Sequence, residues 1–213
     1  MPETSIILIE GRPYTGCKDV YIQDVVTDTD EAYEIGEEVY KVPELVGVSY
    51  NVSATDTSFY ANNVKKLTDT SYNPTASMTL SGDDAKLEKK LFGKKQDGAA
   101  LKDNLGGSPE VSIIYGLTQA KGGWVVRQIP KATCSKSDST VDTKSESLTF
   151  QTSVVNINPL NCEYMDCYTR EFYSTEEVFE GHTMEEVLEI LAKNPTEKFE
   201  TWPATTAMDD DEV

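Results

Sequence analysis

The chain has 213 residues and a formal net charge of -18, from 37 Asp and Glu against 19 Lys and Arg. This length fits one sizeable domain, or one domain with an appendage, and is enough to bury a real core. The acidic excess argues against a protein that grips DNA or RNA, because phosphate contacts are made by Lys and Arg. No run approaches the roughly 18 apolar residues of a membrane span, and the first residues, MPETSIILIEG, lack a basic region before an apolar stretch. We therefore expect neither membrane insertion nor secretion by a classical signal.

Runs of β-branched and aromatic residues, several of them alternating with polar residues, predict that most of the chain is β-strand. The expected strands are Ser5–Ile9, Val20–Val26, Glu44–Val52, Thr75–Leu80, Val111–Leu117, Trp124–Ile129 and Ser147–Asn156. The glycines of QAKGG predict a hairpin between the fifth and sixth of these. In the last strand one face is expected to hold Leu148, Phe150, Thr152 and Val154, and the other Thr149, Gln151 and Ser153. This alternation indicates a sheet with one solvent-exposed face.

Two long polar segments between these strands, Ser53–Asn73 and Lys131–Lys144, are predicted to be loops. Long ordered loops in a compact β-domain are more often functional than accidental.

A first helix is predicted at Asp83–Phe92. Its acidic residues come first, its lysines come late and Gly93 ends it, so both ends match the helix dipole. Leu87 and Leu91 lie on one face at positions i and i+4. We expect this narrow apolar stripe to dock the helix on the sheet.

A second helix is predicted at Met184–Ala192, with a capping box formed by Thr183 and Glu186 and a stop at Asn194-Pro195. Its expected buried side is Val187, Leu188 and Leu191.

Five lysines lie in and just after the first predicted helix, namely Lys86, Lys89, Lys90, Lys94 and Lys95. A face that reads duplex nucleic acid normally carries Arg and lies in a basic domain, whereas this chain has only Arg12, Arg127 and Arg170, all elsewhere. The pattern favours a solvated helix end paired with nearby carboxylates, or a contact with acidic protein, over a nucleic-acid site.

Catalytic and metal-binding patterns are scarce. The four cysteines (Cys17, Cys134, Cys162 and Cys167) are scattered, and His182 is the single histidine, so we expect reduced structural thiols and no metal site. His182 lies just before the second predicted helix, where a residue of the capping turn is the ordinary interpretation. The paired carboxylates are neighbours in sequence, mostly in first helical turns, which suits capping better than acid–base chemistry. We expect no enzyme and no cofactor.

A series of segments between Ile6 and Asn158 has a characteristic order. The segments are SFYANN (58–63), PTASMTLS (74–81), DDAKLEKKLFG (83–93), DG (97–98), PEVSIIYGL (109–117), a GG hairpin and TKSESLTFQT (143–152). Together they resemble the major tail tube protein family of long, non-contractile-tailed bacteriophages. The order of elements and the T-K-S-E-S-x-x-F-Q-T segment are the most specific parts of this resemblance.

The resemblance implies an α+β, mainly β fold: a tail-tube-type β-sandwich of two antiparallel sheets flanked by the helix at Asp83–Phe92. It further implies a structural virion protein whose hexameric rings stack into a tail tube through which the genome is ejected. The implied partners are further copies of the chain and other tail proteins, namely the tape measure, tail terminator and distal tail proteins. The implied location is the virion tail, and the host bacterial cytoplasm before assembly.

The resemblance also implies which residues make contacts between subunits. In the family the long loop between early strands reaches the neighbouring ring, and the candidates here are Thr55, Asp56, Phe59, Tyr60, Asn62, Lys65, Lys66, Asp69 and Tyr72. The candidates for helix docking and subunit contact are Leu87, Lys89, Lys90, Leu91 and Phe92.

Charge is distributed unevenly along the chain. We expect a sandwich domain over residues 1–158 and an acidic extension over 159–213, with the second helix at about 184–192 and a disordered acidic tail. From Leu160 onward there are fifteen Asp and Glu against Arg170, Lys193 and Lys198. Because like charges repel, an acidic wall would keep a duplex off the lining of a conduit, so we expect an acidic lumen that DNA passes without specific binding.

Two alternatives remain open. The first is a β-sandwich carbohydrate-binding or adhesion module of a virion or cell surface, with Tyr164, Tyr168, Phe172 and Tyr173 as an exposed aromatic platform. The second is an acidic enzyme that uses an unrecognised Asp/Glu pair, as in glycoside hydrolysis.

Overall fold

The computed structural model of the chain describes residues 11–42, 45–61, 64–103, 106–137 and 152–202. The fold is α+β and mainly β, as the sequence predicts. The strands are β1 (Tyr14–Asp28), β2 (Tyr33–Ile35), β3 (Tyr40–Val42), β4 (Leu45–Ala61), β5 (Val64–Leu80), β6 (Lys95–Asp97), β7 (Ala100–Lys102), β8 (Glu110–Gln119), β9 (Trp124–Lys136), β10 (Ser153–Pro159) and β11 (Arg170–Tyr173). The α-helices are α1 (Ala85–Phe92) and α2 (Met184–Lys193), and short 3-10 turns lie at Ala120–Gly122 and Glu177–Phe179.

Nine of these strands form one antiparallel sheet. Seven follow the order β2-β1-β8-β9-β10-β5-β4, while β3 pairs with β1 and β11 pairs with β9. The sheet forks at β9, whose one edge pairs with β8. Its other edge pairs first with β11, over Val125–Gln128, and then with β10, over Ala132–Lys136. Strands β6 and β7 form a separate two-stranded hairpin.

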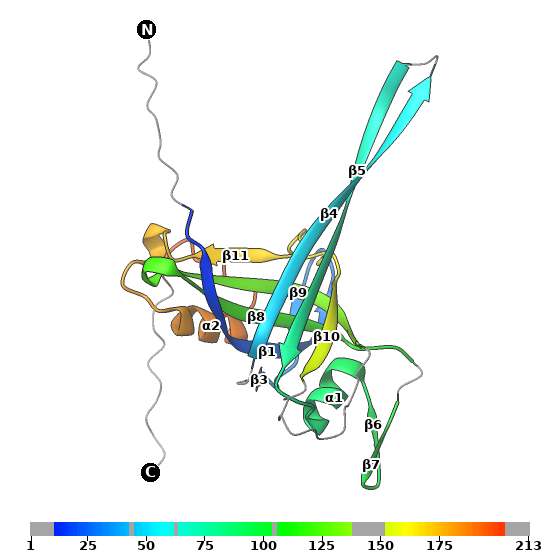
Figure 1. Cartoon of the computed structure of the whole chain (residues 1–213), viewed down its shortest axis with the longest axis vertical. Coiled ribbons are helices and arrows are strands. Elements are labelled where there is room, and N and C mark those ends of the chain that lie inside the picture. Colours follow the sequence, from blue (N-terminus) through cyan, green and yellow to red (C-terminus); the bar gives the residue numbers. More distant parts are fainter. Residues whose placement is uncertain (1–10, 43–44, 62–63, 104–105, 138–151, 203–213) are drawn as a thin grey trace, which may run out of the picture.

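The two layers of the sandwich are therefore halves of one sheet and not two separate sheets. Strands β4 and β5 cross in front of β8 and β9 (Figure 1). A first core fills the space between the layers and includes Ile22 of β1, Met78 of β5, Ile113 of β8 and Ile157 of β10. Strand β9 belongs to both layers, which is possible because strands bend and twist strongly where sheets fold over.

The layer of β1, β8 and β9 is buried on both faces, which explains the nearly continuous apolar run VSIIYGL in β8. Ile113 and Tyr115 face the first core, while the intervening Ile114 belongs to a second core. At Gly116 an added Cβ would lie 2.5 Å from Met184 Sδ. A side chain at this position would therefore displace the Met184 side chain, through which α2 packs on β8.

The second core joins the C-terminal part of the chain to the outer face of this layer. Helix α2 contributes Val187, Leu188 and Leu191, the side that the sequence predicts. Phe172 of β11 and Phe179 pack edge to face, with ring centroids 6.4 Å apart. The predicted capping box at the start of α2 is confirmed, because Thr183 N donates to Glu186 Oε2 at 2.7 Å and Glu186 N donates to Thr183 Oγ1 at 3.3 Å.

Helix α1 closes one end of the first core, also as predicted. Asp84 caps its N-terminus by accepting hydrogen bonds from Lys86 N and Leu87 N. Gly93 ends it in a left-handed conformation with φ of 65°, which glycine adopts at no steric cost. Leu91 is fully buried, and Leu87 packs against the core from its rim.

The predictions for the end of β9 and for the buried face of β10 are wrong. Residues 131–136, expected in a loop, are the end of β9, since Ala132 and Cys134 are buried between pairing strands. In β10 the buried residues are Ser153, Val155 and Ile157, so the face expected to be apolar, with Thr152 and Val154, is the outer one. The sequence alternates clearly there, but β-branched and polar residues occur on both faces, so composition does not decide which face is buried. The predicted strand residues 5–9 and 147–151 lie outside the described part of the chain.

Leu188→Ala should lower the free energy of unfolding by about 3 kcal/mol, because it removes fully buried side-chain volume between α2 and the sheet. Urea unfolding followed by circular dichroism measures this loss. Glu189→Ala, at the exposed neighbouring position, should stay within about 0.5 kcal/mol of wild type. Equal losses in the two variants would contradict the docking of α2 through Leu188.

Candidate assembly surfaces

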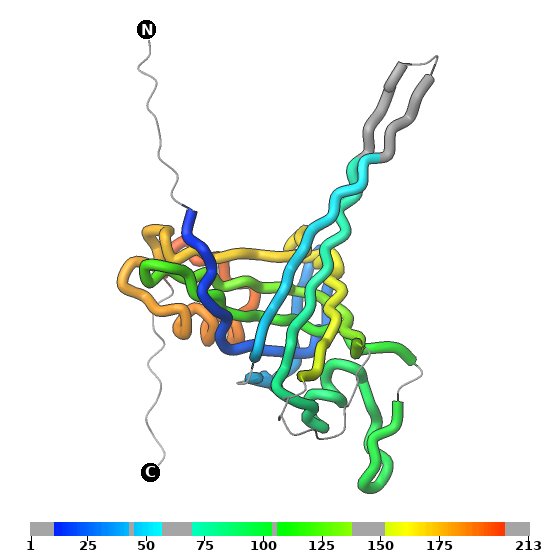
Figure 2. Tube along the Cα trace, in the orientation of Figure 1, coloured from blue at the N-terminus to red at the C-terminus, as the bar shows by residue number. Residues whose placement is uncertain are grey.

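The segment Ser53–Asn73, predicted to be a loop, is instead the continuation of β4 and β5. The two strands pair from Leu45 opposite Leu80 to Ala61 opposite Val64, almost without interruption. The prediction failed because Ser, Thr and Asn are frequent on both faces, which gives a strand without a core the polarity of a loop. The hairpin rises well beyond the body of the molecule (Figures 1 and 2).

Beyond the pair Val52 and Pro74 the hairpin continues for nine more residues in β4. At about 3.4 Å per residue this is roughly 30 Å of two-stranded ribbon. No third strand pairs with this ribbon among the described residues. An isolated two-stranded ribbon is marginally stable in water, so this arm has the form of an element completed by a partner.

The inner face of the hairpin continues the apolar face of the core into solvent. Tyr50 packs against the first core. Further out on the same face, Val52 and Tyr72 are 47% and 58% exposed, with Ala54 beside them. We call Val52, Ala54 and Tyr72 the apolar stripe. Because it lies where the arm leaves the body, it provides apolar area for a docking partner.

The outer face of the same layer is neutral and rich in hydroxyl and amide groups. The strand register assigns to this face Gly47, Ser49, Asn51, Ser53 and Thr55 of β4; Ser71, Asn73, Thr75, Ser77 and Thr79 of β5; Val154, Asn156 and Asn158 of β10; and Thr133 and Ser135 of β9. Ser49 and Ser77 are hydrogen-bonded across the strands at 2.8 Å. We call these positions the neutral face. These positions carry no charged side chain, despite the net charge of -18. Glu110 of β8, opposite Thr133, borders the face and pairs with Lys131 at 3.4 Å.

The base of the hairpin is fixed to the body by a cluster around Arg127 of β9. The guanidinium lies 4.6 Å from the ring centroid of Tyr50 and makes an ion pair with Glu171 of β11 at 2.6 Å. The Tyr50 hydroxyl also lies 3.3 Å from Thr169 Oγ1. The cluster was not predicted, and the sequence carries one signal for it, a lone arginine inside the apolar run WVVRQI.

The candidates for contacts between rings are placed as follows. Thr55, Asp56 and Tyr72 lie on the protruding hairpin, where Asp56 Oδ1 accepts a hydrogen bond from Thr70 at 2.6 Å. Phe59, Tyr60, Lys65, Lys66 and Asp69 lie in the paired strands further out, and their side chains are outside the part that the structure describes. Asn62 is also outside the described residues. Their role in contacts remains a prediction.

The lysines around α1 are partly used within the chain, as the sequence favours. Lys90 is 7% exposed; its ammonium pairs with Asp24 of β1 and lies 4.6 Å from the centre of the Tyr40 ring. Lys94 pairs with Glu88 at 2.7 Å. Lys89 is exposed, and Phe92 packs against the rim of the first core.

Glu88 lies at the centre of the ion pairs that hold α1 against β9. Lys136 of β9 contacts Glu88 at 2.7 Å and Asp83 at 2.5 Å. Burial by itself would raise the pKa of Glu88, but the hydrogen bonds from Lys136 and Lys94 outweigh burial and keep this pKa below its usual value. The carboxylates beside α1 are therefore occupied by lysines of the same chain.

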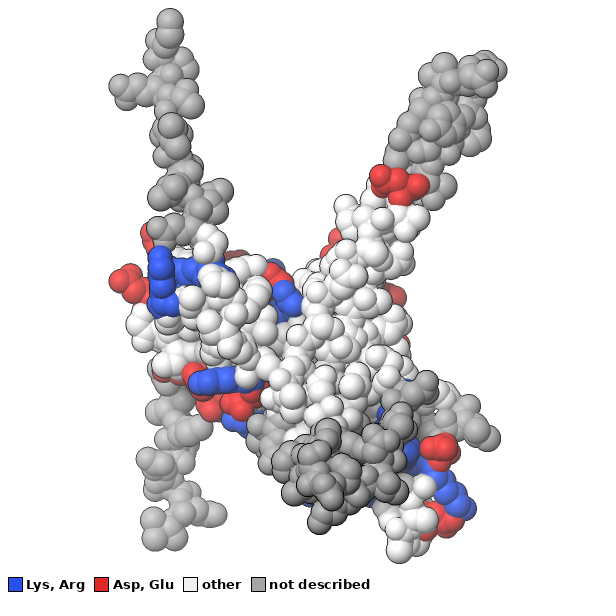
Figure 3. Space-filling model, in the orientation of Figure 1, with Lys and Arg blue, Asp and Glu red and all other residues white. Residues whose placement is uncertain are grey.

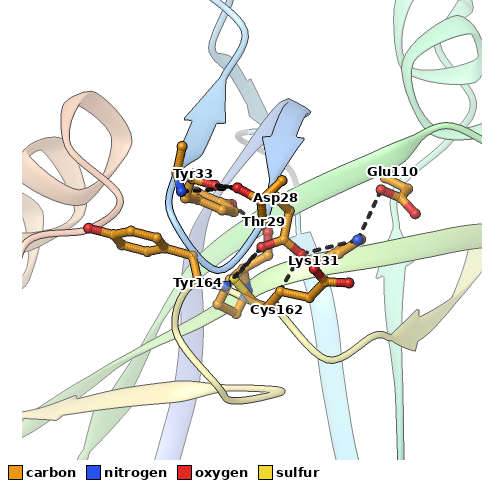
Figure 4. Close-up of polar contacts among 10 residues, drawn as sticks. Asp28, Thr29, Tyr33, Glu110, Lys131, Cys162 and Tyr164 are labelled. Atoms are coloured by element: carbon orange, nitrogen blue, oxygen red, sulfur yellow. Dashed lines mark hydrogen bonds and ion pairs between the residues drawn. The ribbon is translucent and has the colours of Figure 1, made fainter.

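A second cluster joins the end of β1 to the turn before β11 (Figure 4). The Asp28 side chain is 2% exposed and pairs with Lys131 at 3.1 Å. It also accepts hydrogen bonds from Glu163 N, Tyr164 N and the Cys162 thiol, at 3.1, 3.2 and 3.3 Å. Burial opposes ionisation of Asp28, yet these donors prevail and hold its pKa below the ordinary value.

Three other expectations concern binding and catalysis. Of the proposed aromatic platform, Tyr164 and Tyr173 are exposed but Phe172 is buried in the second core, so the four rings do not form one exposed surface. His182 stacks on Trp202, with ring centroids 3.5 Å apart, and its Nδ1 lies 3.4 Å from Glu186 Oε2. Within the described ranges, no group of three or more His, Cys, Asp and Glu is placed to hold a metal ion.

None of the helices in those ranges is long and apolar enough to cross a membrane.

No family model matches the chain, and no curated protein matches it significantly.

The Asp28 cluster predicts how stability depends on pH. Because the pKa of Asp28 is lowered by folding, its contribution is present above the pKa of the unfolded chain, near 3.9, and is lost as the pH falls through the lower folded value. Asp28→Asn should cost about 2 kcal/mol at pH 7, and this cost should shrink as the pH falls below about 4.

Urea unfolding of both proteins between pH 7 and pH 2.5 measures this difference. Asp30→Asn, at an exposed position in the adjoining turn, is the matched control and should follow the wild type throughout. A cost for Asp28→Asn that stays constant over this range would contradict the assignment.

Proposed function

We propose that this protein is a structural, self-assembling subunit of a phage-type tail tube, in which rings of copies stack to form a conduit for the genome. The single observation that carries the proposal is the β4–β5 hairpin, which leaves the body with an exposed apolar stripe and no partner among the described residues. An arm of this kind suits a contact with the next copy along a tube. The order of motifs in the sequence supports the same class.

The free edge of β4 supports assembly within a ring. Beyond its pairing with β5, β4 has no neighbour among the described strands. Its register is regular from Gly47 to Phe59, without the bulges, prolines or lysines that usually protect an edge. Strand pairing between copies would satisfy these backbone groups and close the sheets into a ring.

The proposed lining of the conduit is the neutral face, and not the acidic surface expected from net charge. The open edge belongs to the layer of β4, β5 and β10. If copies of this layer join edge to edge around a channel, the neutral face forms one surface of the resulting wall, and we assign it to the surface that faces the channel. The exposed carboxylates of the C-terminal part lie beyond the second core, on the opposite outer surface of the molecule: Glu176, Glu177, Glu180, Glu185, Glu186 and Glu189.

A neutral lining would still let DNA pass. Affinity for a duplex comes mainly from Lys and Arg, whose contacts with phosphates release counterions. The neutral face carries neither residue at its described positions. Lys131, at its border, is paired with Asp28 and Glu110, so the face offers no free cation at which a moving duplex would be held. Tail partners, hexameric rings and a virion location belong to this proposal as well.

The apolar stripe should control assembly. Val52→Ser combined with Tyr72→Ser should leave a folded protein but raise the concentration needed for tube formation at least tenfold, because each side chain contributes about 1.5 kcal/mol or more when it is buried in a contact. Sedimentation and negative-stain microscopy measure this threshold. Ser53→Ala with Ser71→Ala, on the opposite face of the same hairpin, is the control. Wild-type protein that never forms rings or tubes would refute the proposed function, and unchanged assembly of the serine variant would refute the role of the stripe.

The lining can be tested by adding charge. Ser77→Lys combined with Asn51→Lys should make assembled tubes retain fluorescent duplex DNA at low salt and release it as salt rises. Thr175→Lys, which adds a lysine at an exposed position near the carboxylates of the other surface, should retain no DNA inside the tube. Equal behaviour of the two variants would place the neutral face away from the channel.

A further inference from the structure

Cys162 and Cys167 lie directly opposite each other across a short antiparallel bridge that closes the turn before β11. Cys162 N donates to Cys167 O at 3.0 Å. Residues paired in this way have Cα atoms about 4.5–5.5 Å apart, which is within the range of about 4.4–6.8 Å that a disulfide requires. Both thiols are free in this structure.

We propose that Cys162 and Cys167 are a disulfide site, oxidised by a small-molecule disulfide such as oxidised glutathione. This inference is independent of the proposed function. The sequence predicts only scattered, reduced thiols, because four intervening residues match no common redox or metal motif. The bridge changes this interpretation, because it brings the two cysteines together as a cross-strand pair.

The reaction balances in two exchange steps. The Cys167 thiolate attacks one sulfur of oxidised glutathione, forms a mixed disulfide and releases one glutathione thiolate. The Cys162 thiol then loses its proton to solvent base and attacks the Cys167 sulfur, which releases the second glutathione. The protein loses two protons and two electrons, and one glutathione disulfide takes them up to become two glutathione thiols.

Exposure assigns the order of the two steps. Cys167 is partly exposed, whereas Cys162 is fully buried and donates its S–H to Asp28 Oδ1 at 3.3 Å. The first attack by an external reagent therefore falls on Cys167. Burial also raises the pKa of both thiols, that of Cys162 to about 12, so oxidation should be slow at neutral pH and faster in alkaline solution.

The cross-link would fix the turn that holds Asp28. Glu163 N and Tyr164 N, which donate to the Asp28 carboxylate, lie inside the loop that the disulfide closes. Oxidation removes the S–H donor of Cys162 but leaves these two amides and Lys131 in place. The expected effect is a more stable connection between the end of β1 and the C-terminal part of the chain.

The other two cysteines provide an internal control. Cys134 is buried in the first core and Cys17 lies at its rim, and the cross-strand cysteine bridge does not include either of them. Neither should form an intramolecular disulfide under the same conditions.

The test uses the folded, full-length chain incubated with oxidised glutathione at pH 8.5, then blocked with a maleimide and digested with trypsin. Cleavage after Lys144 and Arg170 yields one peptide that contains both Cys162 and Cys167. We expect this peptide to lose two hydrogen masses and to escape maleimide labelling. The melting temperature of the oxidised protein should rise by roughly 5 °C, and a reductant should reverse the rise.

Two single variants separate the steps. Cys162→Ser should accumulate a glutathione adduct on Cys167, because the second thiol is missing. Cys167→Ser should leave Cys162 without an adduct in the folded protein. The proposal is overturned if the wild-type peptide keeps two thiols that react after denaturation, if the disulfide joins Cys17 or Cys134, or if oxidation lowers the melting temperature.

Discussion

The layer of β1, β8 and β9 is buried on both of its faces, and the remaining elements of the fold pack against it. On one face the chain folds the same sheet back, so that β5 and β10 cover Ile113 and Tyr115. On the other face it adds α2 and a group of aromatic rings over Ile114. Because an antiparallel layer with only one covered face would leave about half of these apolar side chains in water, each covering element is required for the stability of the others.

Polar side chains inside the second core fix how the C-terminal part lies on the sheet. Gln23 and Gln128 donate from the strands to the carbonyls of Ala192 and Pro195, at 2.6 and 2.9 Å. Arg170 Nη1 donates to the same Pro195 carbonyl at 2.9 Å. A buried carbonyl without a donor costs about 1–3 kcal/mol, so these bonds select one position for the segment after α2. The C-terminal part is thus packed on the sandwich, although its acidic composition differs from that of the preceding residues.

The two sheet layers and the layer that contains α2 give the molecule two outer surfaces, which differ in charge. The neutral face lies outside the first core, and the exposed carboxylates around α2 lie outside the second. On the surface that is visible in Figure 3, basic and acidic side chains lie in mixed groups and do not form one large patch of either sign. Net charge therefore describes the chain as a whole but not the surface that a partner or a polyanion would meet.

The fold class, both helices with their caps and the β8–β9 hairpin follow from local signals: helical spacing at Leu87 and Leu91, the Thr183 and Glu186 capping box, and the glycines at 122 and 123. Three features do not follow from local signals: residues 53–73 are paired strands, Ser153 and not Val154 is buried, and Cys162 lies opposite Cys167. These features depend on register and on which layer covers which face. Contacts between residues far apart in the chain set both, and the local pattern of polar and apolar residues does not record them.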